Sequence, residues 1–175
     1  MSRDSAIEIV IDHPALATLP YWQQMATVGV PPHVTLLYPW RPAPVESMSI
    51  DALRAVAEQF VPFTLTLRRV AAFPKGVVYA TVEPEAPVRW LIGAIAEVFP
   101  DAAPYGGEFA GTGPVPHCTL AKCEPDQAES VRLTVAETFE AILPISISVT
   151  SIAVEEQSDT GMWAVTTTVP LGSGR

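Results

Sequence analysis

The sequence has few basic residues. Ten Lys and Arg stand against 19 Asp and Glu, which gives a net charge of −9. Non-specific binding to a polynucleotide depends on Lys and Arg that neutralise phosphates, so a long nucleic acid is not expected as a partner. No apolar run approaches the roughly 18 residues of a membrane-spanning helix. Glu8 and Asp12 also interrupt what would be the apolar core of a signal peptide. The sequence therefore predicts a protein with no membrane partner.

Cysteine is also scarce, with only Cys118 and Cys123 in the chain. If one strand carries both, their side chains point to opposite faces and cannot form a disulfide. This favours a reducing, cytoplasmic setting.

The composition is that of a compact domain. Hydrophobic residues make up 49% of the chain and charged residues 17%, which excludes a disordered protein. The 18 prolines argue against a long helical bundle and for short elements with defined turns. A length of 175 residues suits one domain, and no linker divides residues 1–175. We expect a monomer.

Hydrophobic periodicity predicts an α+β fold with antiparallel hairpins. Helices are predicted over residues 51–60, 87–99 and 125–140. Strands are predicted over residues 7–11, 33–37, 63–67, 76–82, 116–122, 145–154 and 163–169, with the last two paired. In the second helix, Trp90, Ile95 and Val98 are expected on the buried side. Residues 101–115 contain several glycines and are predicted to form a mobile loop or lid.

A five-residue pattern occurs twice, as Pro32-His33-Val34-Thr35-Leu36 and as Pro116-His117-Cys118-Thr119-Leu120. The two copies share P-H-x-T-L and lie about half the chain length apart. They contain two of the three histidines in the protein. A repeat at this distance predicts two similar halves related by a pseudo-twofold axis.

The spacing within each copy places the histidine and the threonine on one face. Residues i and i+2 of a strand point the same way, roughly 6.5 Å apart. The residues expected to point into the core behind them are Val34, Leu36, Cys118 and Leu120. An unperturbed imidazole has a pKa near 6.5, so one ring can be neutral and the other protonated near neutral pH. Such a pair can serve as general base and general acid at a phosphodiester, while the hydroxyls donate to phosphate oxygens. The scheme requires no metal and no other cofactor.

The doubled H-x-T-L resembles the two-histidine (2H) phosphoesterase superfamily. The form P-H-V-T-L-L-Y-P of the first copy resembles its 2′-5′ RNA ligase-like branch. Phe73-Pro74 and the stretch over residues 99–107 add to the likeness. The resemblance implies a bilobed fold, with two antiparallel sheets facing across a central cleft and helices on the outside. It also implies cleavage of 2′,3′-cyclic phosphates or 2′-5′ phosphodiesters, and in some members reversible ligation of RNA ends.

The resemblance assigns a role to each motif residue. His117 becomes the base that activates water and His33 the acid, and ligation would run these roles in reverse. Thr35 and Thr119 become the phosphate contacts. Lys122 occupies a position comparable to that of a basic residue in the family. By strand parity it would face away from His117, so its contact requires a bend or a strand end.

Residues near the first copy offer further contacts, each with a structural alternative. Tyr38 could stack on a base and Arg41 could reach a phosphate, or both could pack at the rim of a proline-rich loop. The Tyr105-Gly106-Gly107 segment could close over a substrate or form a plain surface loop. His13 is expected to end a strand or cap a helix. Trp163 is expected in the core.

Several functions remain compatible with these residues. The leading hypothesis is a metal-independent cyclic phosphodiesterase. A non-catalytic module that binds a phosphorylated nucleotide and an RNA 2′-5′ ligase are the alternatives. The acidic charge favours a small nucleotide cyclic phosphate or an RNA end as the partner. A zinc site is disfavoured, because no carboxylate or thiol holds ligand spacing around the histidines.

Overall fold

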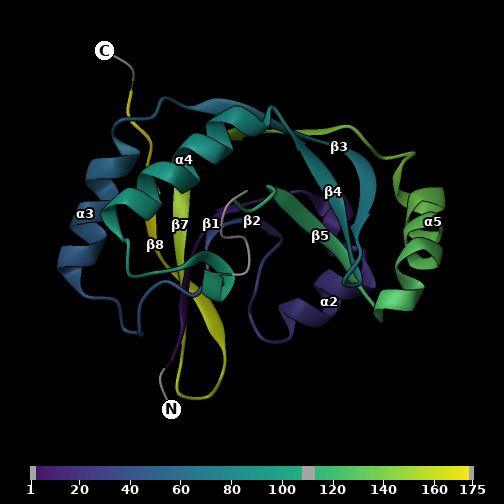
Figure 1. Cartoon of the computed structure of the whole chain (residues 1–175), viewed down its shortest axis with the longest axis horizontal. Coiled ribbons are helices and arrows are strands. Elements are labelled where there is room, and N and C mark those ends of the chain that lie inside the picture. The colour runs from purple at the N-terminus through teal and green to yellow at the C-terminus, as the bar shows by residue number, and fades with distance from the viewer. Residues whose placement is uncertain (1–2, 108–112, 174–175) are drawn as a thin grey trace.

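Two antiparallel four-stranded sheets form the centre of the protein (Figure 1). The computed structural model describes residues 3–107 and 113–173. The first sheet has the order β2-β1-β7-β8 and the second β5-β4-β3-β6. The strands of the first sheet are β1 (Ser5–Val10), β2 (His33–Leu37), β7 (Ser151–Gln157) and β8 (Trp163–Pro170). Those of the second are β3 (Phe63–Phe73), β4 (Val77–Glu83), β5 (His117–Lys122) and β6 (Ile145–Val149). The predicted α+β class is confirmed.

Helices cover both sheets. They are α1 (Pro14–Ala17), α2 (Pro20–Ala26), α3 (Ser47–Ala57), α4 (Glu85–Val98) and α5 (Ala128–Phe139), with short 3-10 turns η1 (Pro104–Gly107) and η2 (Pro125–Gln127). Helix α5 packs on β3 and β4, whereas α3 packs against β8 and α4 against β2 (Figure 1). Helix α2 of the N-terminal segment reaches across to contact β5. In the described part of the chain, no helix is long and apolar enough to cross a membrane.

The prediction of one strand over residues 145–154 is wrong, because the structure has two strands there. The chain leaves the second sheet after β6, which pairs with β3, and enters the first sheet as β7, which pairs with β1 and β8. Only the β7 part pairs with β8 as expected. Apolar and polar residues alternate over residues 145–150, but Thr150 and Ser151 are both polar and three apolar residues follow them, so the alternation ends where the chain changes sheets.

The buried side of α4 also differs from the prediction. Trp90 is 66% exposed and Val98 44% exposed, whereas Ile95 is buried as expected. The helix buries Val88, Leu91, Ile92 and Ile95, which follow the three- and four-residue spacing of one helical face. Trp90 lies off this stripe, so its large apolar side chain faces solvent.

The predicted loop over residues 101–115 contains η1. Residues 108–112 of this loop lie outside the described residues, so the expected lid is described only at its two ends. His13 caps α1, where its Nδ1 accepts a hydrogen bond from the Ala15 N–H at 3.3 Å. This agrees with the expected capping role.

Candidate functional site

The two copies of the motif occupy equivalent places in the two sheets. Strand β2 is an outer strand of the first sheet and β5 an outer strand of the second, and the two strands contact each other. In the first sheet Thr35 lies opposite Glu8 of β1. In the second sheet Thr119 lies opposite Tyr79 of β4. In both sheets, the histidine, the next residue and the threonine of the motif pair with three consecutive residues of the neighbouring strand.

The expected inward and outward faces are found in both motifs. The residues between and after the histidine and the threonine are almost fully buried: Val34, Leu36, Cys118 and Leu120. His33, Thr35, His117 and Thr119 are partly exposed. Each motif thus has a packed apolar back that fixes the position of its polar front.

A bulge follows the threonine in each motif. Ile7 pairs with Leu37 while Glu8 pairs with Thr35, so Leu36 is an extra residue on β2. Likewise Val78 pairs with Ala121 while Tyr79 pairs with Thr119, which makes Leu120 an extra residue on β5. A bulge shifts the alternation of the residues that follow it.

This shift brings Lys122 to the same side of β5 as His117. Tyr38, at the corresponding position of the first motif, is brought to the same side as His33. Parity alone had predicted that Lys122 points away. The bulge supplies the bend that the contact requires. The Nζ of Lys122 lies 5.7 Å from the centroid of the Tyr21 ring.

One cavity of about 440 Å³ collects these side chains. Of the residues singled out from the sequence, it is lined by His33, Thr35, Tyr38, His117, Thr119 and Lys122. Its other lining residues include Glu8, Glu155, Tyr105 and Trp163. Trp163 was expected in the core; it is partly buried against the core and also lines the cavity.

Both imidazole rings are held in the same way. His33 Nδ1 lies 2.8 Å from the Pro31 carbonyl and His117 Nδ1 lies 2.7 Å from the Val115 carbonyl. A carbonyl can only accept, so each Nδ1 carries a proton and donates it. In the neutral ring, Nε2 is then the nitrogen with the free lone pair. The two rings are therefore set up to exchange protons through Nε2.

Burial shifts both imidazoles toward the neutral form. Burial is the main cause that lowers the pKa of His33 to about 4, and the positive charge of Lys122 contributes. The pKa of His117 is lowered as well, again chiefly by burial. Both rings are therefore neutral at neutral pH, and a general acid requires negative charge near one of them.

The surroundings of the two histidines differ. The edge of the Trp22 ring lies near His33, at 5.4 Å between ring centroids. His117 packs against two rings, Phe73 at 5.1 Å and Tyr79 at 5.4 Å. His33 instead has a carboxyl group beside it, since Glu8 Oε2 lies 3.3 Å from His33 Nδ1.

Two buried carboxyls on the first sheet were not found from the sequence. Glu8 is fully buried and Glu155 is 2% exposed. Neither Glu8 oxygen has a hydrogen-bond partner, and the same holds for Glu155 Oε1. The alternation of Glu8 with Ile7 and Ile9 predicted a strand but assigned no role to Glu8. The available signal was that Glu8 is the single acidic residue in an otherwise apolar strand. In the structure, Glu8 lines the cavity and is buried there.

Burial changes the protonation of both carboxyls. It raises the pKa of Glu8 to about 9, with a further contribution from the negative charge of Glu155. Burial also raises the pKa of Glu155 to about 7. Glu8 is therefore protonated at neutral pH.

This shift predicts that stability falls with pH. Above its ordinary pKa of 4.5, Glu8 loses its proton in the unfolded chain but keeps it in the folded protein until about pH 9. The unfolded state then binds fewer protons, so the free energy of unfolding falls by about 1.4 kcal/mol per pH unit. Between pH 7 and 8.5 this amounts to about 2 kcal/mol. Glu155, whose pKa burial raises to about 7, is half protonated at pH 7 and adds to the fall at the lower end of this window.

Urea unfolding of the wild type and of Glu8→Gln at pH 7, 7.75 and 8.5 measures the effect. The amide does not titrate, so the variant should lose most of the slope, and the part that remains near pH 7 belongs to Glu155. Equal slopes for the two proteins would show that Glu8 is already ionised when folded.

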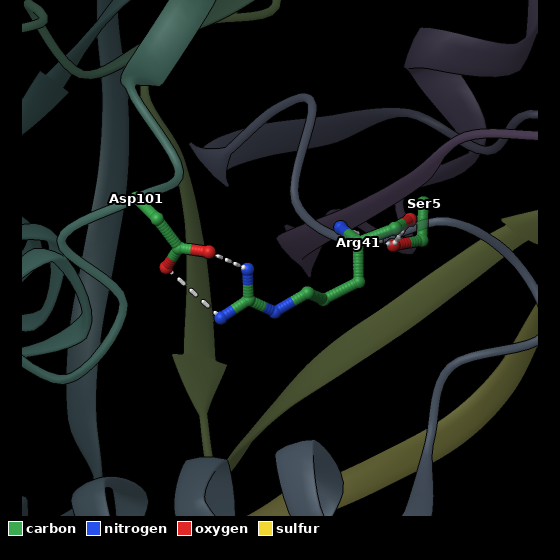
Figure 2. A network of polar contacts seen from close by, with 3 residues as sticks. All are labelled: Ser5, Arg41 and Asp101. Atoms are coloured by element: carbon green, nitrogen blue, oxygen red, sulfur yellow. Dashed lines mark hydrogen bonds and ion pairs between the residues drawn. The ribbon is translucent and has the colours of Figure 1, made fainter. Parts of the chain in front are cut away.

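Arg41 lies outside the set of residues that line the cavity, and its contacts with Asp101 and Ser5 are shown in Figure 2. Its guanidinium pairs with both carboxylate oxygens of Asp101, at 2.5 and 3.1 Å, and lies 5.2 Å from the centroid of the Phe99 ring. Its backbone exchanges hydrogen bonds with the Ser5 hydroxyl. The hydrogen bond from Arg41 is the main cause that lowers the pKa of Asp101. Arg41 therefore joins two loops through Asp101, outside the residues that line the cavity.

Among the described residues of the predicted lid, Tyr105 lines the cavity. Its N–H donates to the Tyr38 carbonyl at 2.7 Å, and it adopts a positive φ of 50°. Burial raises the pKa of its hydroxyl, while a hydrogen bond with Thr35 opposes the rise. The segment before residue 108 is therefore tied to the first motif.

Comparison with known proteins agrees with this geometry. The sequence profile described as the 2′-5′ RNA ligase superfamily matches residues 17–161. TT0787 of Thermus thermophilus superposes with a TM-score of 0.57 at 19% identity, covering 98% of this chain and 100% of that one. LigT of E. coli complexed with NADP+ gives 0.59 at 20% identity, covering 98% of each chain. The same protein complexed with 3′-AMP gives 0.58 at 18% identity, covering 98% and 99%. The chain matches no curated protein sequence.

Proposed function

Because the chain belongs to the 2′-5′ RNA ligase superfamily, we propose that it is a metal-independent cyclic phosphodiesterase acting on nucleotides or RNA ends. The substrates would be 2′,3′-cyclic phosphates or 2′-5′ phosphodiesters. The observation that best supports this is that His33 and His117 line one cavity and that a backbone carbonyl holds Nδ1 of each ring. An acid and a base on two sides of one phosphorus are sufficient for this chemistry.

In the proposed reaction, a water molecule attacks the cyclic phosphate. His117 Nε2 takes a proton from the water as the new P–O bond forms. His33, as an imidazolium, gives its Nε2 proton to the ribose oxygen as the old P–O bond breaks. Charge that grows on the non-bridging oxygens is stabilised by Thr35, Thr119 and the ammonium of Lys122.

The size and walls of the cavity favour a small substrate. A volume of about 440 Å³ suits a mononucleotide better than a polymer, and the net charge of −9 disfavours a long polyanion. LigT was crystallised with 3′-AMP, with NADP+ and with phosphate. By analogy, the aromatic rings of Tyr38 and Trp163 would offer a stacking surface for a base beside the phosphate site.

Turnover tests the proposal. We expect the purified protein to open 2′,3′-cyclic nucleotides in the presence of EDTA, with the product identified by mass. Dinucleotides with 2′-5′ linkages and RNA ends with a 2′,3′-cyclic phosphate complete the panel. Tight binding of every substrate without turnover would favour a non-catalytic module. Loss of activity in EDTA would indicate a metal, and joining of RNA ends without hydrolysis would indicate a ligase.

A further inference from the structure

The two motifs are alike in sequence and register, but the residue opposite each threonine differs. Thr35 faces a carboxyl group, that of Glu8, across the β1–β2 pair. Thr119 faces an aromatic ring, that of Tyr79, across the β4–β5 pair. The position that is equivalent in the two sheets therefore carries an acid on one side of the cleft and a hydrophobic surface on the other.

This difference gives the two histidines different neighbours. Glu8 Oε2 is 3.3 Å from His33 Nδ1, whereas Phe73 and Tyr79 pack against the His117 ring. Glu8 is fully buried, and neither of its oxygens has a hydrogen-bond partner. A buried polar group without a partner is costly, so an ionic partner at this distance is a strong stabilising contact for either member of the pair.

We propose that Glu8 is a positioning residue that supplies the negative charge needed to make His33 the general acid, which leaves His117 as the general base. The inference rests on the proposed function and gives a structural cause for the two proton-transfer roles stated there.

The pair carries one exchangeable proton. Before substrate binds, this proton is on Glu8, and the pair is a neutral carboxyl beside a neutral imidazole. Because Nδ1 of His33 already donates its proton to the Pro31 carbonyl, the second proton must be taken up at Nε2. When an anionic phosphodiester binds, Glu8 releases its O–H proton to solvent and His33 takes up a proton from solvent at Nε2, so carboxylate and imidazolium form with no change in net charge. The imidazolium then gives its Nε2 proton to the leaving oxygen. His117 has meanwhile gained the proton of the water, and exchange with solvent restores Glu8 and His117.

Other titratable groups around the cavity do not replace Glu8. They are Tyr21 of α2, Tyr38 after β2, Tyr105 of η1, His117, Cys118 and Lys122 of β5, and Glu155 of β7. Burial raises the pKa of Tyr21 and of Cys118 to about 12, and it raises those of Tyr38 and Tyr105 as well, so these groups stay neutral. The charge of Lys122 opposes an imidazolium at both histidines. Glu155 is the one acidic alternative within this group of described residues and serves as the comparison.

The test measures the pH profile of kcat for the wild type, Glu8→Gln and Glu155→Gln with 2′,3′-cyclic AMP. We expect Glu8→Gln to lower kcat ten- to hundredfold with a smaller change in KM. Its basic limb, which reports the acid, should move to lower pH by at least one unit, while the acidic limb stays in place. Glu155→Gln should move the basic limb by less than a third of that. A loss of kcat with no movement of either limb, a shift of the acidic limb, or equal shifts in the two variants would overturn the proposal.

A second measurement does not depend on turnover or on the folding of a variant. The ring nitrogens of 15N-histidine in the wild-type protein, saturated with inorganic phosphate, report the protonation of each imidazole by NMR. We expect His33 to become imidazolium at a higher pH than His117. The opposite order would overturn the proposal even if the enzyme is active. The expected order in a protein that turns over no substrate would leave the charge assignment standing and would reject only the proposed function.

Discussion

Replacing either His33 or His117 by alanine should lower kcat/KM for a 2′,3′-cyclic nucleotide by about 10²- to 10⁴-fold, the range typical of one positioned proton transfer. Each imidazole handles a different proton, one on the attacking water and one on the leaving oxygen. The double variant should be little worse than either single one, because residues that act as a unit lose their effects together. Initial rates with product identified by mass give the result.

His13→Ala is the matched control, since it removes the third histidine of the chain. His13 caps α1 and does not line the cavity, so its loss should cost about 1 kcal/mol of stability and leave kcat/KM within twofold. Unfolding curves for all three variants separate lost chemistry from lost structure. A His33 or His117 variant that keeps wild-type activity would reject the paired-histidine mechanism.

The position of the two motifs could be predicted from the sequence because two local rules agree. A repeated H-x-T on strands of alternating character fixes both which side chains face the cleft and which form the core, and Val34 and Cys118 are fully buried as expected. Bringing the two strands together in space needed the resemblance to a family, because no local pattern states which sheet edges meet. The outer strands β2 and β5 are in contact.

Three features of the site were beyond this reasoning, each for a physical reason. The bulge at Leu120 reverses the parity of Lys122, and its sequence has no glycine that would mark it. Glu8 is an acidic residue in an apolar strand, and strand alternation does not show whether its side chain faces solvent or a buried part of the cleft. Arg41 has a nearby acid, Asp101, that lies far away in the sequence and therefore gives no local signal.

The equivalent registers support a single domain of two pseudo-symmetric lobes, which remains our proposal. Each sheet pairs its motif strand with the preceding strand of the same sheet and places a bulge after the threonine. The lobes are not the two halves of the chain, since β7 and β8 return to the sheet that contains β1. Duplication of one unit would explain why the two motif strands pair alike. The two copies then differ at the position opposite the threonine, which is Glu8 in one and Tyr79 in the other.

Gly76→Ala should destabilise the protein by about 3 kcal/mol or more, the largest effect expected outside the catalytic pair. Gly76 closes the β3–β4 turn with a φ of +86°, a region that L-residues enter at a cost of roughly 1 kcal/mol. An added Cβ would also lie 2.0 Å from the Cys123 carbonyl oxygen, which is backbone and cannot rotate away. The Gly76 carbonyl accepts a hydrogen bond from the Cys123 N–H at 2.8 Å, so the clash would also displace the end of β5 beside Lys122.

Gly161→Ala separates the two causes. Gly161 has a similar φ of +81°, but an added Cβ there meets nothing within 4 Å. This variant should lose only the roughly 1 kcal/mol of the backbone conformation. Urea unfolding at one pH gives both values, and their difference measures the close approach of the β3–β4 turn to the end of β5. If the two variants lose equal stability, the turn can move away from Cys123 without cost, and Lys122 is then not held in the cleft by that contact.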